Sequence, residues 1–378
     1  MKIAYFTATY YPTPDGVSYY LRDVKSELER LGHEVHVFSL NGDKREKNVH
    51  VPLTFPLPMY KQYSIPFNMI PAKLYNYVLK NEFDIIHIHD PFFGTLGYRA
   101  ARKTKAPIIA TFHTDFVKMK DSLNMPLKDL LFGLAWRYNI FEYKRCDLVL
   151  APSGYSKDYL EGFGLRNVKE FPLFVNKKNI PEINRKTEGF NVLYLGRLTK
   201  DKGVMKILDV AKATSPEVRF TIAGTGPHED EIRKRIKSEG MNEKIELLGY
   251  ISDEEKYKRI FSASIFISPS LTDTFGISVL EALMSGTPAL VQSGFPLSKY
   301  YNGADTGIVE VDFSKPKEVG GVINSLLNNR EQLQKLANNA AKLSEQNFSL
   351  ESHCKNLIEI YESLLEKKHL IKLNSRSA

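Results

Sequence analysis

The chain has little cysteine. Cys146 and Cys354 are its two cysteines in 378 residues, and they lie far apart in no spacing typical of metal ligands. This scarcity speaks against a disulfide framework and favours a reducing, cytoplasmic setting. No apolar run approaches the roughly 20 residues that a membrane-spanning helix needs. The opening segment MKIAYFTATYYP has one lysine and polar interruptions, so we expect no signal peptide.

Short repeats, low-complexity segments and recognised nucleic-acid motifs are also lacking. The net charge of +8 nevertheless predicts an anionic partner. Basic residues are scattered along the chain and not gathered into one arm. We therefore expect a phosphate-bearing substrate, an anionic membrane surface, or both, and no nucleic acid as partner.

The composition, with 43% apolar and 25% charged residues, is that of a soluble globular protein, and the length suits two domains. Short apolar runs typical of strands alternate with amphipathic segments typical of helices, and a linker rich in Pro, Asn, Lys and Gly interrupts them over 171–189. This order predicts α/β domains with mostly parallel sheets. The expected strands are 2–7, 34–40, 85–89, 108–113, 148–152, 191–195, 219–223, 245–248 and 265–268. The expected helices are 18–31, 229–239, 253–261 and 350–368.

Candidate binding residues follow the predicted strands, where open parallel sheets bind their ligands. The first strand leads to Gly16, which opens a helix whose free N–H groups would favour an anion. A simple turn glycine is the alternative. After residues 191–195, Arg197 offers a fork of donors and Lys202 a mobile point charge, a pair that suits a diphosphate. Two solvated surface cations are the alternative here.

The segment SPSLTDTFGISVLEALMSGTP is the most informative stretch. Asp273 precedes a helix that begins near Gly276, and Glu281 lies about one and a half turns into it, so both carboxylates can face one cleft. Their oxygens would accept hydrogen bonds from sugar and ribose hydroxyls, and the N–H groups of Gly276, Ile277 and Ser278 would point at an anion. Taken alone, the segment also fits a capping Asp and an ordinary helical Glu.

His87 and His89 alternate along one predicted strand and therefore face the same side, next to Asp90. Such a pair suggests a metal site, but no third or fourth ligand has a convincing spacing. We interpret both as histidines hydrogen-bonded at a strand end, and we expect no metal.

Together these motifs resemble the retaining GT-B glycosyltransferases of family 4. The hallmark of that family is a pair of acids separated by seven residues, in a context like E-x-F-G-x-x-x-x-E-A-x-x-x-G-x-P, and the chain has DTFGISVLEALMSGTP at 273–288. Residues 14–16, 32–37, 84–89, 196–203 and 224–227 continue the resemblance in the expected order. The first acid is Asp instead of Glu, a form that some lipid-modifying branches share.

The resemblance implies the fold and its division. A GT-B protein has two Rossmann-like domains with parallel sheets facing an interdomain cleft. Residues 1–172 would form the acceptor-side domain and residues 173–348 the domain that binds a nucleotide sugar. Residues 349–378 would form a C-terminal helix that packs back toward the first domain.

The resemblance also implies a role for each candidate. Gly16, Arg197 and Lys202 would hold the diphosphate of the donor. His113, in FHTDF, matches a histidine beside the transferred sugar, and Asp273 would contact that sugar. The catalytic set would be His113, Asp273, Arg197 and Lys202. The other donor-binding residues would be Tyr250 and Ile251 near the nucleobase, Phe275, Gly276, Ile277 and Ser278 at the phosphate or sugar, and Glu281 at the ribose.

The implied reaction is transfer of a hexose from a GDP-mannose or UDP-glucose type donor, with retention and without a metal or other cofactor. YFTATYYP and FHTDF look like members that glycosylate membrane lipids, and residues 117–145 mix Lys and Arg with Leu, Phe, Met and Trp136, as an interfacial helix would. An ordinary domain helix is the alternative there. We expect a peripheral enzyme that acts on a lipid or lipid-linked glycan at the cytoplasmic face of the cell membrane.

Other functions remain open on the sequence. The acceptor could be soluble, as in polysaccharide or small-glycoside synthesis. The chain could also be a noncatalytic partner-binding subunit or a sugar epimerase of the same architecture. A dinucleotide-dependent oxidoreductase is disfavoured, because no G-x-G-x-x-G follows the first strand.

Overall fold

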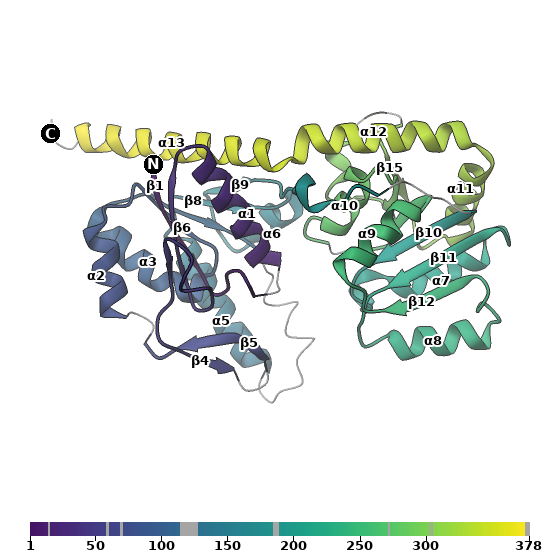
Figure 1. Ribbon diagram of the computed structural model, residues 1–378, viewed down its shortest axis with the longest axis horizontal. Helices are drawn as coiled ribbons and strands as arrows, with labels where there is room; N and C mark the ends of the chain where they lie inside the picture. Colours follow the sequence, from purple (N-terminus) through teal and green to yellow (C-terminus); the bar gives the residue numbers. More distant parts are fainter. Residues whose placement is uncertain are drawn as a thin grey trace. The chain divides into compact units, whose positions relative to one another are not determined.

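The computed structural model describes residues 1–13, 16–57, 60–68, 71–113, 128–183, 189–270, 273–301, 303 and 305–374. The chain divides into two compact units. The first unit consists of Met1–Pro172 and His353–Ala378, and the second unit of Leu173–Ser352. Each contains a parallel sheet with helices on both faces, which confirms the predicted α/β fold class (Figure 1).

The sheet of the first unit has the strand order β3-β2-β1-β6-β7-β8-β9, and every pair in it is parallel. Its strands are short apolar runs because both of their faces are buried. Two further strands form a separate antiparallel pair. The bounds are β1 (Lys2–Thr7), β2 (Glu34–Ser39), β3 (Val49–His50), β6 (Ile85–Ile88), β7 (Ile108–Thr111), β8 (Leu148–Ala151) and β9 (Val168–Glu170), with β4 (Thr54–Leu57) and β5 (Tyr60–Pro66) as the separate pair.

Helices cover both faces of this sheet. Phe6 and Phe38 point to a core that is completed by one set of helices, namely α2 (Ala72–Lys80), α3 (Pro91–Thr104), α5 (Lys128–Tyr143) and α6 (Gly154–Gly162). Tyr5 and His87 point to the opposite face, because neighbouring strand residues alternate. This second face is covered by α1 (Gly16–Arg30) and by α13 (Leu350–Asn374).

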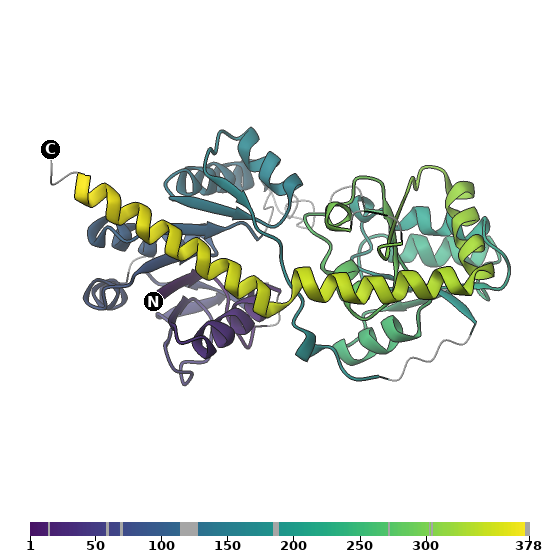
Figure 2. The same ribbon diagram turned by 90° about the horizontal axis from the view of Figure 1, so that it is seen from above.

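The C-terminal helix α13 is attached to the first unit by buried polar contacts, and it lies over that unit in Figure 2. The hydroxyl of Tyr361 lies 2.7 Å from His87 Nδ1 and 3.2 Å from the hydroxyl of Tyr5. His353 bonds through Nδ1 to the carbonyl of Pro172. These side chains are buried, so each contact also satisfies a polar group that would otherwise be costly to bury.

The sheet of the second unit has the order β12-β11-β10-β13-β14-β15 and is also parallel throughout. The sequence predicted its first four strands, the helices over 229–239 and 253–261 and a helix beginning near Gly276, but not the elements between residues 289 and 348. The strands are β10 (Phe190–Leu195), β11 (Val218–Ala223), β12 (Ile245–Gly249), β13 (Ile265–Ser268), β14 (Ala289–Gln292) and β15 (Ile308–Val311). One face carries α7 (Val204–Lys212), α8 (Glu229–Ser238) and α11 (Pro316–Asn328); the other carries α9 (Asp253–Ser262), α10 (Ile277–Met284) and α12 (Arg330–Phe348).

Each sheet has one point where the strand order reverses. In the first unit the reversal lies between β1 and β6, and in the second unit between β10 and β13. The loops that leave the carboxyl ends of these strand pairs diverge to opposite faces, which opens a crevice suited to a ligand. The fold therefore selects the loops after β1, β6, β10 and β13 as the first places to look for a site.

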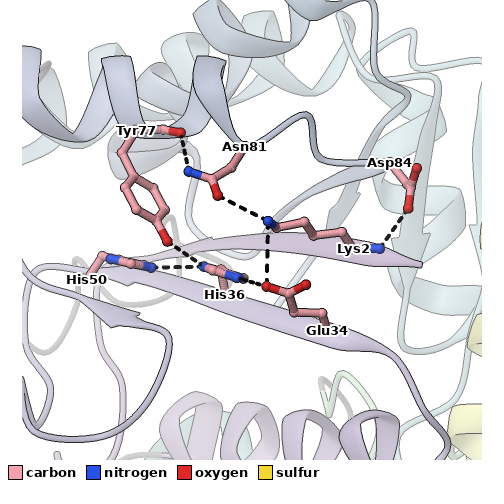
Figure 3. A network of polar contacts seen from close by, with 7 residues as sticks. All are labelled: Lys2, Glu34, His36, His50, Tyr77, Asn81 and Asp84. Atoms are coloured by element: carbon pink, nitrogen blue, oxygen red, sulfur yellow. Dashed lines mark hydrogen bonds and ion pairs between the residues drawn. The ribbon is translucent and has the colours of Figure 1, made fainter.

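A polar network occupies the edge of the first sheet (Figure 3). His36 Nε2 lies 2.7 Å from Glu34 Oε1, and its Nδ1 lies 3.0 Å from Nε2 of His50. Lys2 contacts Glu34, and the hydroxyl of Tyr77 approaches His36. Burial lowers the pKa of His36 despite the neighbouring Glu34, and burial together with His36 lowers the pKa of His50 to about 4.

The buried histidines predict that acid destabilises the first unit. Burial lowers the pKa of His353 to about 3, and it also lowers the pKa of His50. A histidine with a lowered folded pKa stabilises the fold above its unfolded pKa of about 6.5, and this stability is lost as the pH falls toward the folded value. Denaturant titrations should therefore give a lower unfolding midpoint at about pH 5.5 than at about pH 7.5. The difference between the midpoints at the two pH values should be smaller in His50→Gln than in the wild type. Equal midpoints at the two pH values in the wild type would contradict the conclusion that buried neutral histidines stabilise this unit.

Candidate functional site

The loops at the reversal point of the second sheet bring a predicted cation and a predicted carboxylate together. Lys202 follows β10 in a short 3-10 turn, and Asp273 follows β13. Lys202 Nζ lies 2.6 Å from Asp273 Oδ2, and both side chains are more than four-fifths buried. The other oxygen of Asp273 accepts a hydrogen bond from the backbone N–H of Phe275. A charge-assisted bond of this kind fixes both side chains at the strand ends.

The helix α10 begins directly after this loop, and its geometry requires a glycine. Gly276 has a φ of +96°, and a methyl group on its Cα would lie 2.5 Å from the ring of Phe295. Ile277 and Ser278 follow in the first turn, where helix N–H groups have no partner within the helix. The ring of Phe275 is 1% exposed and packs edge-on against Phe348. Its side chain therefore belongs to the core.

Glu281 lies on α10 and is held by two residues of α9. Its Oε1 accepts hydrogen bonds from Lys256 Nζ at 2.8 Å and from the hydroxyl of Tyr257 at 3.3 Å. Lys256 also contacts Asp253. Burial favours the neutral amine of Lys256, but Glu281 and Asp253 outweigh it and raise the pKa of this lysine. The carboxylate is thus oriented by a cation that stays charged at neutral pH.

Sequence reasoning missed Lys256 and Tyr257. The signal that points to them is the start of α9: Ser252 caps the helix by accepting from the N–H of Glu255, directly after β12. The first turn of α9 therefore lies at the same edge of the sheet as the loops after β10 and β13.

The remaining predicted donor residues of the second unit are more exposed. Tyr250 follows β12 and is 83% exposed, whereas Ile251 is partly buried against the core. Arg197 is half-exposed and pairs with Asp201 at 3.6 Å. A surface ion pair at this distance contributes little to stability, so breaking it to bind a ligand through the guanidinium costs little free energy.

In the first unit, Gly16 and His113 are both associated with α1. Gly16 is the first residue of that helix, and a methyl group built on it meets nothing within 4 Å. Tyr20, one turn further on, places its ring edge-on to His113 with centroids 5.1 Å apart. His113 follows β7, and its Nε2 lies 2.9 Å from Nδ1 of His89, which follows β6.

His87 and His89 are buried, His113 is half-buried, and all three are neutral at neutral pH. Burial lowers the pKa of His113 to about 4 and the pKa values of His87 and His89 well below the ordinary value. His87 is hydrogen-bonded at the strand end as the sequence predicts, to Tyr361 and to Thr111. Over the described ranges, no three side chains of His, Cys, Asp or Glu are grouped so as to hold a metal ion.

The segment 117–145 lies in part outside the described residues, which resume at 128 in α5. Trp136 and Ile140 of this helix are buried in the core. Leu130, Leu134 and Phe141 are each more than half exposed, at a spacing that places them on one side of the helix. In the part of the chain that the structure describes, no helix has both the length and the apolar character needed to cross a bilayer.

Two Rossmann-like units with polar loops at the reversal points of their sheets have the architecture of GT-B glycosyltransferases, and solved structures of that class match it. Anabaena HepE, solved in complex with UDP, matches with a TM-score of 0.73 at 17% identity over 96% of this chain and 100% of that one. The model of Glycosyltransferase Family 4 matches residues 14–177, and the model of Glycosyl transferases group 1 matches residues 175–343. The chain belongs to glycosyltransferase family 4, as its motifs predict.

Curated relatives extend over the chain. It is 24% identical to the alpha-monoglucosyldiacylglycerol synthase of Acholeplasma laidlawii over 100% of both chains. It is 25% identical to the phosphatidyl-myo-inositol mannosyltransferase of Mycolicibacterium smegmatis, over 91% of this chain and 89% of the relative. Both names describe enzymes that glycosylate lipids.

Three glycines test the geometry of the site. Gly276→Ala should lower the unfolding midpoint of the second unit by the equivalent of at least about 1 kcal/mol, because alanine resists a positive φ and would collide with Phe295. Gly321→Ala, within α11 of the same unit, should not destabilise, since a methyl group there meets nothing within 4 Å. Gly16→Ala should be tolerated for the same reason. A loss of stability in Gly16→Ala comparable to that of Gly276→Ala would contradict this account.

Proposed function

We propose that the protein transfers a hexose from a nucleoside diphosphate sugar to a membrane lipid or lipid-linked glycan, with retention of the anomeric configuration and without a metal. The observation that carries the proposal is the pair of Lys202 and Asp273 at the start of α10. It places a cation, a carboxylate and free helix amides at one reversal point, which is the combination that a sugar diphosphate requires.

The diphosphate would bind by exchanging partners with groups already in place. Lys202 would turn from Asp273 to a phosphate oxygen, which leaves Asp273 to accept hydrogen bonds from hydroxyls of the sugar. Arg197 would leave its surface pair with Asp201, and the amides of Ile277 and Ser278 would add two donors. These groups stabilise the negative charge that develops on the departing diphosphate.

The nucleoside would be held by the second carboxylate. Lys256 and Tyr257 both bond to Oε1 of Glu281, and no described residue bonds to its Oε2. This leaves Oε2 as the acceptor for the ribose hydroxyls. The exposed ring of Tyr250, at the end of β12, offers a surface on which a nucleobase can stack.

The choice of a lipid acceptor is supported by the two relatives that glycosylate lipids and by the surface of the first unit. Leu130, Leu134 and Phe141 form an exposed apolar stripe on α5, and the net charge of +8 favours anionic headgroups. The protein would thus act from the cytoplasmic side as a peripheral enzyme. That Gly16 binds the diphosphate and that His113 lies beside the transferred sugar stay predictions of the family resemblance.

Activity should depend on the paired residues of the second unit. With UDP-glucose or GDP-mannose as donor and diacylglycerol or phosphatidylinositol in mixed micelles, Lys202→Ala and Glu281→Ala should each lower kcat/KM at least about 100-fold. Lys200→Ala, an exposed lysine of the same 3-10 turn, is the matched control and should keep the wild-type rate. NMR of the product should show the anomer of the donor, and EDTA should leave the rate unchanged. Wild-type turnover in Lys202→Ala would refute the site.

Membrane binding should depend on the stripe of α5. In flotation experiments the protein should rise with vesicles containing phosphatidylglycerol, and the double variant Leu134→Glu with Phe141→Glu should remain at the bottom, because two carboxylates oppose burial at an anionic interface. Leu31→Glu, at an exposed leucine outside α5, should float like the wild type. A protein that never associates with anionic vesicles would exclude the peripheral role.

A further inference from the structure

His113 and His89 share one hydrogen bond, and its direction decides what His113 can do. His89 Nδ1 lies 2.9 Å from His113 Nε2. Burial lowers the pKa values of both imidazoles, so each carries a single proton at neutral pH. A hydrogen bond between ring nitrogens at 2.9 Å needs one N–H and one lone pair, so only one of the two facing nitrogens holds a hydrogen. The other must present its lone pair.

The opposite side of His89 distinguishes the two arrangements. His89 is 5% exposed, and its Nε2 is buried without a hydrogen-bond partner among the described residues. The rings of Tyr5 and His87 lie beside it, with centroids 4.8 Å and 4.1 Å away. If His113 donated to His89, the proton of His89 would be on this orphaned nitrogen. Buried N–H groups without a partner are rarer than buried acceptors without one, so the proton of His89 belongs on Nδ1.

The other neighbours of His113 do not change this assignment. Tyr20 presents its ring to His113, while its hydroxyl bonds to Nε2 of His353 at 2.9 Å. His353 bonds through Nδ1 to the carbonyl of Pro172 and is itself neutral, since burial lowers its pKa to about 3. Among the described groups that face His113, none therefore carries a charge that would draw a second proton onto its ring.

We propose that His89 donates from Nδ1 to Nε2 of His113 and thereby fixes His113 as the tautomer with its proton on Nδ1. The one lone pair of His113 is then used by His89. The residue acts on the substrate as a hydrogen-bond donor to an oxygen of the sugar or the acceptor, and not as a general base. His89 is the positioning residue for this role. The role of His113 rests on the proposed function, but its tautomer does not.

The tautomer can be measured directly by NMR on the full chain with 15N-labelled histidine. Long-range 1H–15N spectra distinguish a protonated ring nitrogen from a bare one, and His113→Gln identifies the signals of His113 among the nine histidines. The expected result is a protonated Nδ1 and a bare Nε2. A bare Nδ1 with a protonated Nε2 in the wild type would overturn the proposal, whether or not the protein transfers sugars.

Three variants of His89 separate positioning from simple packing. His89→Asn keeps an N–H donor near the position of Nδ1, and His113 should keep its tautomer and most of its activity. His89→Asp offers only acceptors, so His113 should move its proton to Nε2 and kcat/KM should fall about tenfold, the effect of losing one hydrogen bond. His89→Leu should lose activity like His89→Asp. His50→Gln, in the separate network at the sheet edge, should leave the signals of His113 unchanged.

The outcomes are distinguishable. If His89→Asp leaves the tautomer of His113 unchanged, His89 does not set it. If the tautomer changes as expected but kcat/KM is unaffected in an otherwise active enzyme, His113 does not donate to the substrate. If no donor is turned over by the wild type, the proposed function fails, and the NMR result still decides the assignment of the proton.

Discussion

A parallel sheet places the carboxyl ends of all its strands along one edge, and in both units of this protein that edge carries the polar residues that we propose to bind the donor or to react. The backbone groups at strand ends have to be satisfied by loops and helix starts, and this requirement puts short polar segments next to free helix amides. Lys202 and Asp273 meet for this reason, although 70 residues lie between them in the sequence. The same constraint places His89 beside His113 in the first unit.

The charged residues of the second unit are paired with one another before any ligand arrives. Lys202 with Asp273 and Lys256 with Glu281 are mostly buried pairs, so neither leaves an isolated charge in a low-dielectric environment. A diphosphate carries more charge than one carboxylate, so it can compete for Lys202 while Asp273 gains hydroxyl partners. Donor binding as proposed above requires different behaviour of the two pairs. Lys202 has to release its partner, whereas Lys256 has to keep hold of Glu281.

The sequence predicted the positions of strand ends better than the contacts made there. Gly276, Asp273 and Glu281 could be placed because one continuous motif spans a strand, a turn and a helix. The contact between Lys256 and Glu281 could not be predicted from the sequence, because it joins two helices whose packing depends on the whole core. His87 and His89 were correctly placed on one side of their strand by the alternation of residues.

Several elements escaped prediction for a related reason. The strands β14 and β15 were not predicted, and their length of four residues is not the reason, since β6 and β13 are equally short and were predicted. Residues 308–310 of β15 are not fully buried, so its apolar pattern is weaker than that of a central strand. The helix α13 was predicted from its composition, yet the partners of Tyr361 lie more than 270 residues away in β1 and β6. Contacts over such separations carry no local signal.

The attachment of α13 has a consequence for how the protein is made. Synthesis proceeds from the N-terminus, and the first unit contains the earliest and the latest parts of the chain. Until Tyr361 leaves the ribosome, the hydroxyl of Tyr5 and Nδ1 of His87 lack this partner, and α1 is the one helix described on that face of the first sheet. The second unit, Leu173–Ser352, is encoded entirely between these two parts of the first unit. The nascent chain therefore completes its middle before its beginning.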